Sequence, residues 1–366
     1  MKLITKCVLL LMPTLVLVTP AFALPPTALS DSGQPGSIII YPKFVNLPAV
    51  NVDGITVPRT EIEIGAICLP AFLAAGNSCA EHQPVTVLFR WVCPGAEGVN
   101  SNICPEEDFE VNLTANGKRA FSADGIPINS NSPLVPAAPC PRGYLIGSAQ
   151  SDLPIKFDGL IGNAIIRGEN LVAGPNAGSS TGISAYQAIT IQAGTGITGL
   201  QIGDVRFDKT AAGDPLPSVL SKTALIFLTL NVLANQPNDP TLVNLDFWNE
   251  SLGNAVGSTN PAFEHLTSTS VEFLCWVQVP LSALAGGNLT QAFQGTRKGV
   301  VIAGPAQKVR DGNAPGDTPG PVTLIGLVET VEGTAANGFL ERKYNFNMST
   351  NGVPQPIAFV PLPNFP

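Results

Sequence analysis

The sequence predicts an all-β fold of antiparallel sheets, arranged as β-sandwiches of an immunoglobulin-like or jelly-roll-like kind and supported by disulfides. Three observations lead to this fold class. Residues 84–93 alternate between apolar and polar side chains, as a half-buried strand does. The 366 residues include 36 glycines and 34 prolines, which favours short strands joined by tight turns. Only 13% of the residues are charged, against about 25% in average domains, so the chain has enough uncharged residues to form a sizeable core.

The stretch 84–93 is the clearest strand in the chain. One row of its side chains is apolar and ends in a tryptophan and a cysteine: Val85, Val87, Phe89, Trp91 and Cys93. The other row contains Thr86 and Arg90. Since successive side chains of a strand point to opposite faces, the first row is expected to face the core, with Trp91 inside it.

The N-terminus has the features of a secretory signal peptide. Lys2 and Lys6 precede an apolar run at residues 8–18, and a small-x-small site ends at Ala23. This run is too short to span a bilayer. We therefore expect cleavage after residue 23 and a secreted, cell-surface or periplasmic protein.

The charge balance excludes polyanionic partners. Residues 1–23 carry two of the 19 basic residues and none of the 27 acidic ones, so their removal changes the net charge from −8 to −10. Nucleic acid and anionic lipid surfaces repel such a protein. The remaining chain contains no apolar run of membrane-spanning length, so no transmembrane segment is expected in the mature chain.

Six cysteines remain after the leader, and an even number in an exported chain favours disulfides. Two pairs share the same spacing of 11 residues, and this predicts the local bridges Cys68–Cys79 and Cys93–Cys104. In the loop-entropy model each would contribute about 3 kcal/mol. The third bridge would then be Cys140–Cys275. A zinc site is the alternative, but the close Cys-x-x-Cys pairs that it usually requires are absent.

The elements of the first half follow from alternation and turn residues. Residues 37–45 form a strand with a bend at Pro42, and residues 60–68 form a half-buried strand with outward charges. Asn116-Gly117 predicts a hairpin between residues 109–115 and 118–122, because both residues tolerate positive φ. Further strands are expected at residues 143–148, 155–166 and 186–192.

The second half begins after a turn-rich segment, so we expect an N-terminal β-sandwich domain at 24–195 and a C-terminal one at 196–366. Residues 224–233 are nearly all apolar, as in a strand buried on both faces. Residues 271–279 repeat the alternation of 84–93 and again place a tryptophan beside a cysteine. The other expected strands are 242–248, 299–303, 322–331 and 339–346, and short helical turns fit residues 281–285.

Two sequence motifs that are typical of enzymes lack the flanking strand and helix that they require. Residues 194–199 match a dinucleotide-binding fingerprint and residues 178–182 a nucleophile elbow, but neither lies between a strand and a helix. The two histidines, His82 and His265, each follow a glutamate. Because a hydrolase needs its base oriented next to a nucleophile, no catalytic and no cofactor-binding residue is predicted.

Two features point to ligand binding. Asp311, Asn313 and Asp317 lie in one loop and offer oxygen ligands for calcium, the one cofactor considered, although their spacing fits no EF-hand. Trp276 falls on the polar row of its strand and Trp248 precedes Asn249-Glu250. A tryptophan exposed among polar groups is what a sugar-binding platform requires.

These observations favour a secreted, non-catalytic, β-rich surface or extracellular interaction protein whose partner is a protein or glycan at the cell surface. The first alternative is a carbohydrate- or ligand-binding extracellular β module built on Trp248 and Trp276. The second is a secreted hydrolase.

Overall fold

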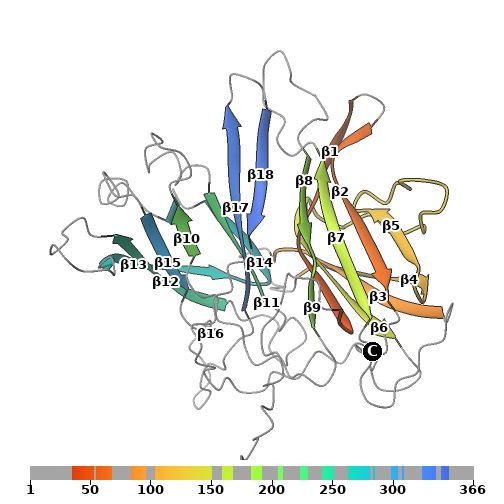
Figure 1. Cartoon of the computed structure of the whole chain (residues 1–366), viewed down its shortest axis with the longest axis horizontal. Coiled ribbons are helices and arrows are strands. Elements are labelled where there is room, and N and C mark those ends of the chain that lie inside the picture. Colours follow the sequence, from red (N-terminus) through yellow and green to blue (C-terminus); the bar gives the residue numbers. More distant parts are fainter. Residues whose placement is uncertain are drawn as a thin grey trace, which may run out of the picture.

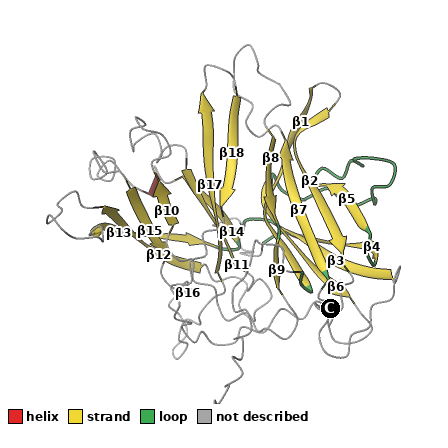
Figure 2. Ribbon diagram, viewed as in Figure 1, coloured by secondary structure: helices red, strands yellow, loops and turns green. Residues whose placement is uncertain are grey.

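The computed structural model describes residues 35–52, 55–67, 84–95, 104–150, 159–167, 183–191, 205–208, 223–229, 241–250, 263–280, 283–284, 298–303, 307–308, 324–334 and 339–345. Within these ranges the regular structure is almost entirely β, and only Ala283 and Leu284 are helical (Figure 2). Every strand pair among the described residues is antiparallel. The predicted all-β, antiparallel class is therefore confirmed.

The first nine strands form one sheet (Figure 1). Its order is β4-β3-β6-β1-β2-β7-β8, with β5 also paired to β2 and β9 to β1. The strands are β1 (Ile38–Val52), β2 (Ile55–Ala66), β3 (Pro84–Val92), β4 (Glu106–Thr114), β5 (Lys118–Ser122), β6 (Arg142–Gln150), β7 (Leu160–Arg167), β8 (Ile183–Gln187) and β9 (Ile189–Ile191).

Strand β1 belongs to two groups of paired strands. We call them the first ladder, which contains β3, β4, β6 and β9, and the second ladder, which contains β2, β5, β7 and β8. The first part of β1, through Val45, pairs with β6 and β9, and its second part, from Asn46, pairs with β2. The register with β6 shifts between Tyr41 and Phe44. The bend predicted at Pro42 lies inside this shift, because proline has no N–H to donate to a ladder. The two ladders thus meet along one continuous strand.

The two ladders bury a common core. The apolar row predicted for β3 is buried, and Trp91 is fully buried, as predicted. Phe89 of β3 lies 5.4 Å from the ring centroids of both Phe109 on β4 and Phe121 on β5. Burying each such aromatic side chain is worth about 1.5–3 kcal/mol. Because Phe89 and Phe121 come from different ladders, this aromatic cluster holds the ladders against each other.

The turn at Asn116-Gly117 is confirmed, but the predicted hairpin is wrong. Asn116 has a φ of 61°, and the amide of Gly117 donates to the Thr114 carbonyl at 2.7 Å. However, β4 pairs with β3 and β5 pairs with β2. The turn therefore carries the chain from one ladder to the other. Tertiary burial decides this outcome, since Phe121 must reach the core from the second ladder.

The second half of the chain forms two further sheets. One has the order β10-β15-β12-β13 with β16 paired to β12, and the other has the order β14-β11-β17-β18. Their strands are β10 (Val205–Asp208), β11 (Thr223–Thr229), β12 (Thr241–Glu250), β13 (Phe263–Phe273), β14 (Trp276–Pro280), β15 (Lys298–Ala303), β16 (Gln307–Lys308), β17 (Leu324–Thr334) and β18 (Phe339–Asn345). No sheet combines strands from before and after residue 195 among the described residues.

Strand β11 is the centre of the four-stranded sheet. It pairs with β14 on one side and with β17 on the other. Its apolar residues from Ala224 to Leu228 are all buried. The interpretation of the run 224–233 as a strand covered on both faces is confirmed for residues 224–229, and residues 230–233 lie outside the described residues.

The alternating stretch 271–279 is two strands rather than the single one predicted. Strand β13 ends at Phe273 in the five-stranded sheet, and β14 starts at Trp276 in the four-stranded sheet. The chain changes sheets at Leu274 and Cys275, where the Cys275 carbonyl accepts a hydrogen bond from the Thr229 amide at 3.1 Å. Alternation continues through the bend, so the sequence pattern alone does not reveal it.

Candidate functional site

The most distinctive arrangement of polar groups lies where the nine-stranded sheet meets the C-terminal sheets. We call this region the junction. Hydrogen-bonded pairs and a disulfide between described residues cross it: Lys43 with Glu329, Trp276 with Pro42, Tyr144 with Thr229, and Cys104 with Cys275. In addition, β18 lies beside β8, so edge strands of the two parts are neighbours (Figure 1).

The bend of β1 places Lys43 in the junction. At this bend the Tyr186 hydroxyl replaces the lost ladder partner, because it donates to the Lys43 carbonyl and accepts from the Lys43 amide at 3.2 Å. The Lys43 side chain is fully buried, at 0% exposure. A buried ammonium group requires a partner, since an unpaired charge in the interior is very costly.

Glu329 of β17 supplies that partner. One of its carboxylate oxygens, Oε2, accepts a hydrogen bond from Lys43 Nζ, and the side chain is only 1% exposed. The other oxygen, Oε1, accepts from Gln278 Nε2 at 3.0 Å. Breaking a buried ion pair by removing one partner typically costs about 3–5 kcal/mol. Lys43, Glu329 and Gln278 thus form one buried polar cluster, which we call the Lys-Glu-Gln cluster.

The register of the four-stranded sheet explains how two side chains of this cluster meet. On β11, Ala224 is opposite Glu329 of β17 and Ile226 is opposite Gln278 of β14. Ala224 and Ile226 are two residues apart, so all four side chains lie on the same face of the sheet. Beside the short side chain of Ala224, the Glu329 side chain extends across β11 to reach Gln278 of β14.

Trp276 lies on that same face and is not the exposed platform that we predicted. Its indole N–H donates to the Pro42 carbonyl at 2.8 Å, and the residue is only 6% exposed. The hydrogen bond also satisfies a backbone carbonyl at the bend of β1. A buried indole cannot stack on a sugar, so this half of the predicted platform is wrong.

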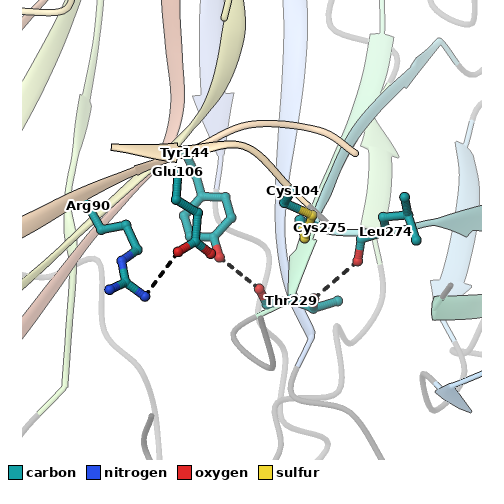
Figure 3. The surroundings of a disulfide bond; sticks show 7 residues. All are labelled: Arg90, Cys104, Glu106, Tyr144, Thr229, Leu274 and Cys275. Carbon is teal, nitrogen blue, oxygen red and sulfur yellow. Dashed lines mark hydrogen bonds and ion pairs between the residues drawn. A yellow bond between two sulfur atoms is a disulfide. The ribbon is translucent and has the colours of Figure 1, made fainter. Parts of the chain in front are cut away.

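A second group of junction contacts surrounds a disulfide (Figure 3). Cys104 and Cys275 are bonded across 171 residues of sequence, with their Cα atoms 6.3 Å apart. Nearby, the Tyr144 hydroxyl donates to the Thr229 carbonyl at 3.0 Å. Burial raises the pKa of Tyr144 well above its ordinary value, so this phenol stays protonated and able to donate.

An ion-pair network lies next to this disulfide. Arg90 contacts both oxygens of Asp108, at 2.6 and 2.8 Å. Its third nitrogen lies 3.1 Å from Glu106, and Figure 3 shows this ion pair. The hydrogen bond to Asp108 is the main cause of a raised pKa at Arg90. Burial raises the pKa of Glu106, although the charge of Arg90 opposes the shift. The arrangement fixes charges in a structural network and leaves no nucleophile beside a base.

The disulfide pairing corrects two of the three predicted bridges. Cys93 is bonded to Cys140, with their Cα atoms 5.9 Å apart, and Cys104 to Cys275. Cys93–Cys104 and Cys140–Cys275 are therefore wrong. Cys93 follows β3 and Cys140 precedes β6, and the antiparallel pairing of these strands brings both ends together. Cys68 and Cys79 lie outside the described residues, so that bridge stays a prediction.

Several other predicted site residues lie outside the described residues. They are His82, the loop residues Asp311, Asn313 and Asp317, and the motifs at 178–182 and 194–199. Trp248 and His265 are register partners in the pairing of β12 with β13. In the described part of the chain, no group of three or more His, Cys, Asp or Glu side chains is arranged to hold a metal ion.

No helix among the described residues has the length and apolar character needed to cross a membrane.

Sequence reasoning missed the Lys-Glu-Gln cluster, although a signal was present. Lys43 is the one charged residue in the strand predicted at 37–45, and Glu329 is the first in the strand predicted at 322–331. A lone charge in an apolar strand requires a buried partner or a bend toward solvent. The sequence does not show that these two charges find each other.

Comparison with known proteins adds no further assignment, because the chain matches no protein-family model and no curated protein.

Proposed function

We propose that the protein is a secreted, non-catalytic surface or extracellular interaction protein whose two β-sandwich units, 24–195 and 196–366, act as one rigid body. The observation that carries this proposal is the Cys104–Cys275 disulfide, which joins the two units across 171 residues. Disulfides persist in oxidising compartments outside the cytosol. The leader-like N-terminus, with its cleavage site at Ala23, agrees with such a compartment.

The polar groups of the junction support a structural role. The side chains of Lys43 and Glu329 are at most 1% exposed, and Trp276 is buried. None of these groups is accessible to a substrate from solvent. Their partners are all within the chain, so they stabilise the contact between the units.

The exposed acidic residues of strand β4 limit how a partner binds. Glu107, Asp108 and Glu110 are exposed on this strand, which ends the order of the nine-stranded sheet. Charged side chains on an edge strand oppose addition of a further strand. We therefore place the partner, a protein or glycan at the cell surface, against loops or sheet faces rather than along β4.

The experiment has two arms. The full chain is expressed with its leader in an exporting host, and the cell fractions are analysed by intact mass and thiol labelling. We expect a product that begins after residue 23, outside the cytosol, without free thiols at Cys104 and Cys275. The labelled product is then added to intact cells of the source organism, where saturable binding that unlabelled protein displaces is expected.

Other outcomes would reject the proposal. A cytosolic protein with its leader intact and reduced cysteines contradicts export. Labelling of a single serine by a hydrolase-directed probe, abolished by His265→Ala, would favour the hydrolase alternative. Binding to a glycan array that is lost on Trp248→Ala would favour the carbohydrate-binding alternative.

A further inference from the structure

The Lys-Glu-Gln cluster combines a nucleophile, a proton carrier and an amide in one buried site. Lys43 Nζ and Gln278 Nε2 bind the two oxygens of the same Glu329 carboxylate. The lysine nitrogen and the Gln278 amide are therefore held by one carboxylate group. The three residues come from β1, β14 and β17, so the cluster spans the junction.

Proton transfer within this buried pair is the step that gives the reactive forms of these groups. Lys43 and Glu329 are at most 1% exposed, and the interior penalises a separated pair of charges. Transfer of one proton from the lysine to the carboxylate converts the ion pair into a neutral amine and a neutral acid. A neutral amine is a nucleophile, and a neutral acid is a proton donor.

The amide oxygen of Gln278 provides a second, independent observation. This Oε1 atom is buried and has no hydrogen-bond partner among the described residues. Buried amide oxygens are nearly always hydrogen-bonded in folded proteins, and an exception calls for an explanation such as a chemical role. The Gln278 amide is held through its nitrogen only, by the carboxylate that also holds the amine.

We propose that Lys43 and Gln278 form an intramolecular isopeptide bond, with Glu329 as the catalytic proton carrier. Lys43 Nζ attacks Gln278 Cδ, and a bond forms between these two atoms. Glu329 takes a proton from Nζ and delivers one to Nε2. The Cδ–Nε2 bond then breaks, ammonia leaves and the carboxyl group is regenerated. The reaction is redox-neutral and requires no co-reactant.

This cross-link joins the two β units independently of the disulfide between them. It does not depend on the proposed export, since no oxidant takes part. A reduced protein would therefore keep a covalent connection between β1 and β14. The bond also removes the buried charge pair at Lys43 and Glu329, which is costly to maintain.

Mass spectrometry of the folded, full-length protein tests the proposal directly. After reduction and alkylation, the intact mass is expected to be lower than the sequence mass by one ammonia. Trypsin is expected to leave the bond after Lys43 uncut, and a branched peptide is expected to join the Lys43 peptide to residues 223–297. An unmodified mass with normal cleavage after Lys43 overturns the proposal. Loss of one water, localised to Lys43 and Glu329, also overturns it, since the lysine would then be bonded to the carboxylate.

Three variants separate the chemistry from folding. Lys43→Arg keeps the positive charge opposite Glu329 but lacks a nucleophilic amine, and Glu329→Gln removes the proton carrier. Both are expected to lack the branched peptide. The matched control is Gln187→Ala, which alters an exposed glutamine on β8 and is expected to retain the cross-link. A branched peptide at full yield in folded Glu329→Gln would contradict the assigned role of Glu329.

Discussion

The indole N–H of Trp276 donates to the carbonyl oxygen of Pro42 at 2.8 Å, although 234 residues separate them. Pro42 lies at the bend of β1, and Trp276 is the first residue of β14. This hydrogen bond therefore joins the point where the N-terminal sheet changes direction to the point where the chain enters the four-stranded sheet. The junction is built from such long-range pairs.

Removal of the Trp276 hydrogen bond should lower the stability of the protein by a measurable amount. Trp276→Phe keeps most of the buried aromatic surface but leaves the Pro42 carbonyl without its donor. We expect a loss of about 1–3 kcal/mol in the free energy of unfolding, because a buried acceptor becomes unsatisfied. Urea denaturation measures it. A variant as stable as the parent would mean that the Pro42 carbonyl does not depend on this donor.

The Cys104–Cys275 bridge should stabilise the protein through the long loop that it closes. In the loop-entropy model, a bridge across 171 residues contributes up to about 5 kcal/mol. We expect the Cys104→Ser/Cys275→Ser variant to unfold at a lower urea concentration than the parent. The Cys93→Ser/Cys140→Ser variant is the comparison. Because its missing bridge closes a shorter loop of 47 residues, this variant should lose less stability. The reverse order would contradict the entropic explanation.

Because the pKa of Glu106 is raised, the stability of the protein should depend on pH. Burial raises the pKa of Glu106 in the folded state, so folding favours the protonated form. Its contribution to stability is therefore present below the ordinary glutamate pKa, about 4.3, and is lost as the pH rises through the raised folded value.

The matched variants Glu106→Gln and Glu107→Gln test this dependence. Glu106→Gln cannot ionise, so the parent should lose stability relative to this variant as the pH increases from 4 to 7. Glu107 is an exposed neighbour on β4, and its variant serves as the control for the loss of one surface charge. Equal pH profiles for the parent and Glu106→Gln would contradict the raised pKa of Glu106.

The buried tyrosines should resist ionisation. Burial raises the pKa of Tyr41 and of Tyr144 well above the ordinary value of about 10. Of the four tyrosines in the chain, at least two should remain protonated in alkaline solution until the protein unfolds. Ultraviolet titration of phenolate absorbance counts them, and Tyr144→Phe should lower the late-titrating number by one. Four phenols titrating together in the folded protein would contradict this burial.

Local sequence patterns predicted much of the fold. The alternation of residues 84–93 predicted β3 and its buried row, and the near-continuous apolar run at 224–233 predicted the central strand β11. The bend at Pro42 also followed from the chemistry of one residue, since proline cannot complete a ladder. These successes share one cause, because period-2 burial and proline geometry act within a few residues of sequence.

Long-range pairings were not predictable in the same way. Asn116-Gly117 makes the expected turn, yet Phe121 is required in the core of the other ladder, and this separates β5 from β4. Equal spacing suggested Cys93–Cys104, whereas the pairing of β3 with β6 brings Cys140 to Cys93. The contact of Lys43 with Glu329 likewise depends on the bend of β1 and on the small side chain of Ala224.

We propose that the two β units form one covalently joined body. Peptide mapping of the native protein under non-reducing conditions tests it most directly. We predict recovery of one peptide pair linked through Cys104 and Cys275 and another linked through Cys93 and Cys140. Recovery of a Cys93–Cys104 pair, or of free thiols at Cys104 and Cys275, would contradict it.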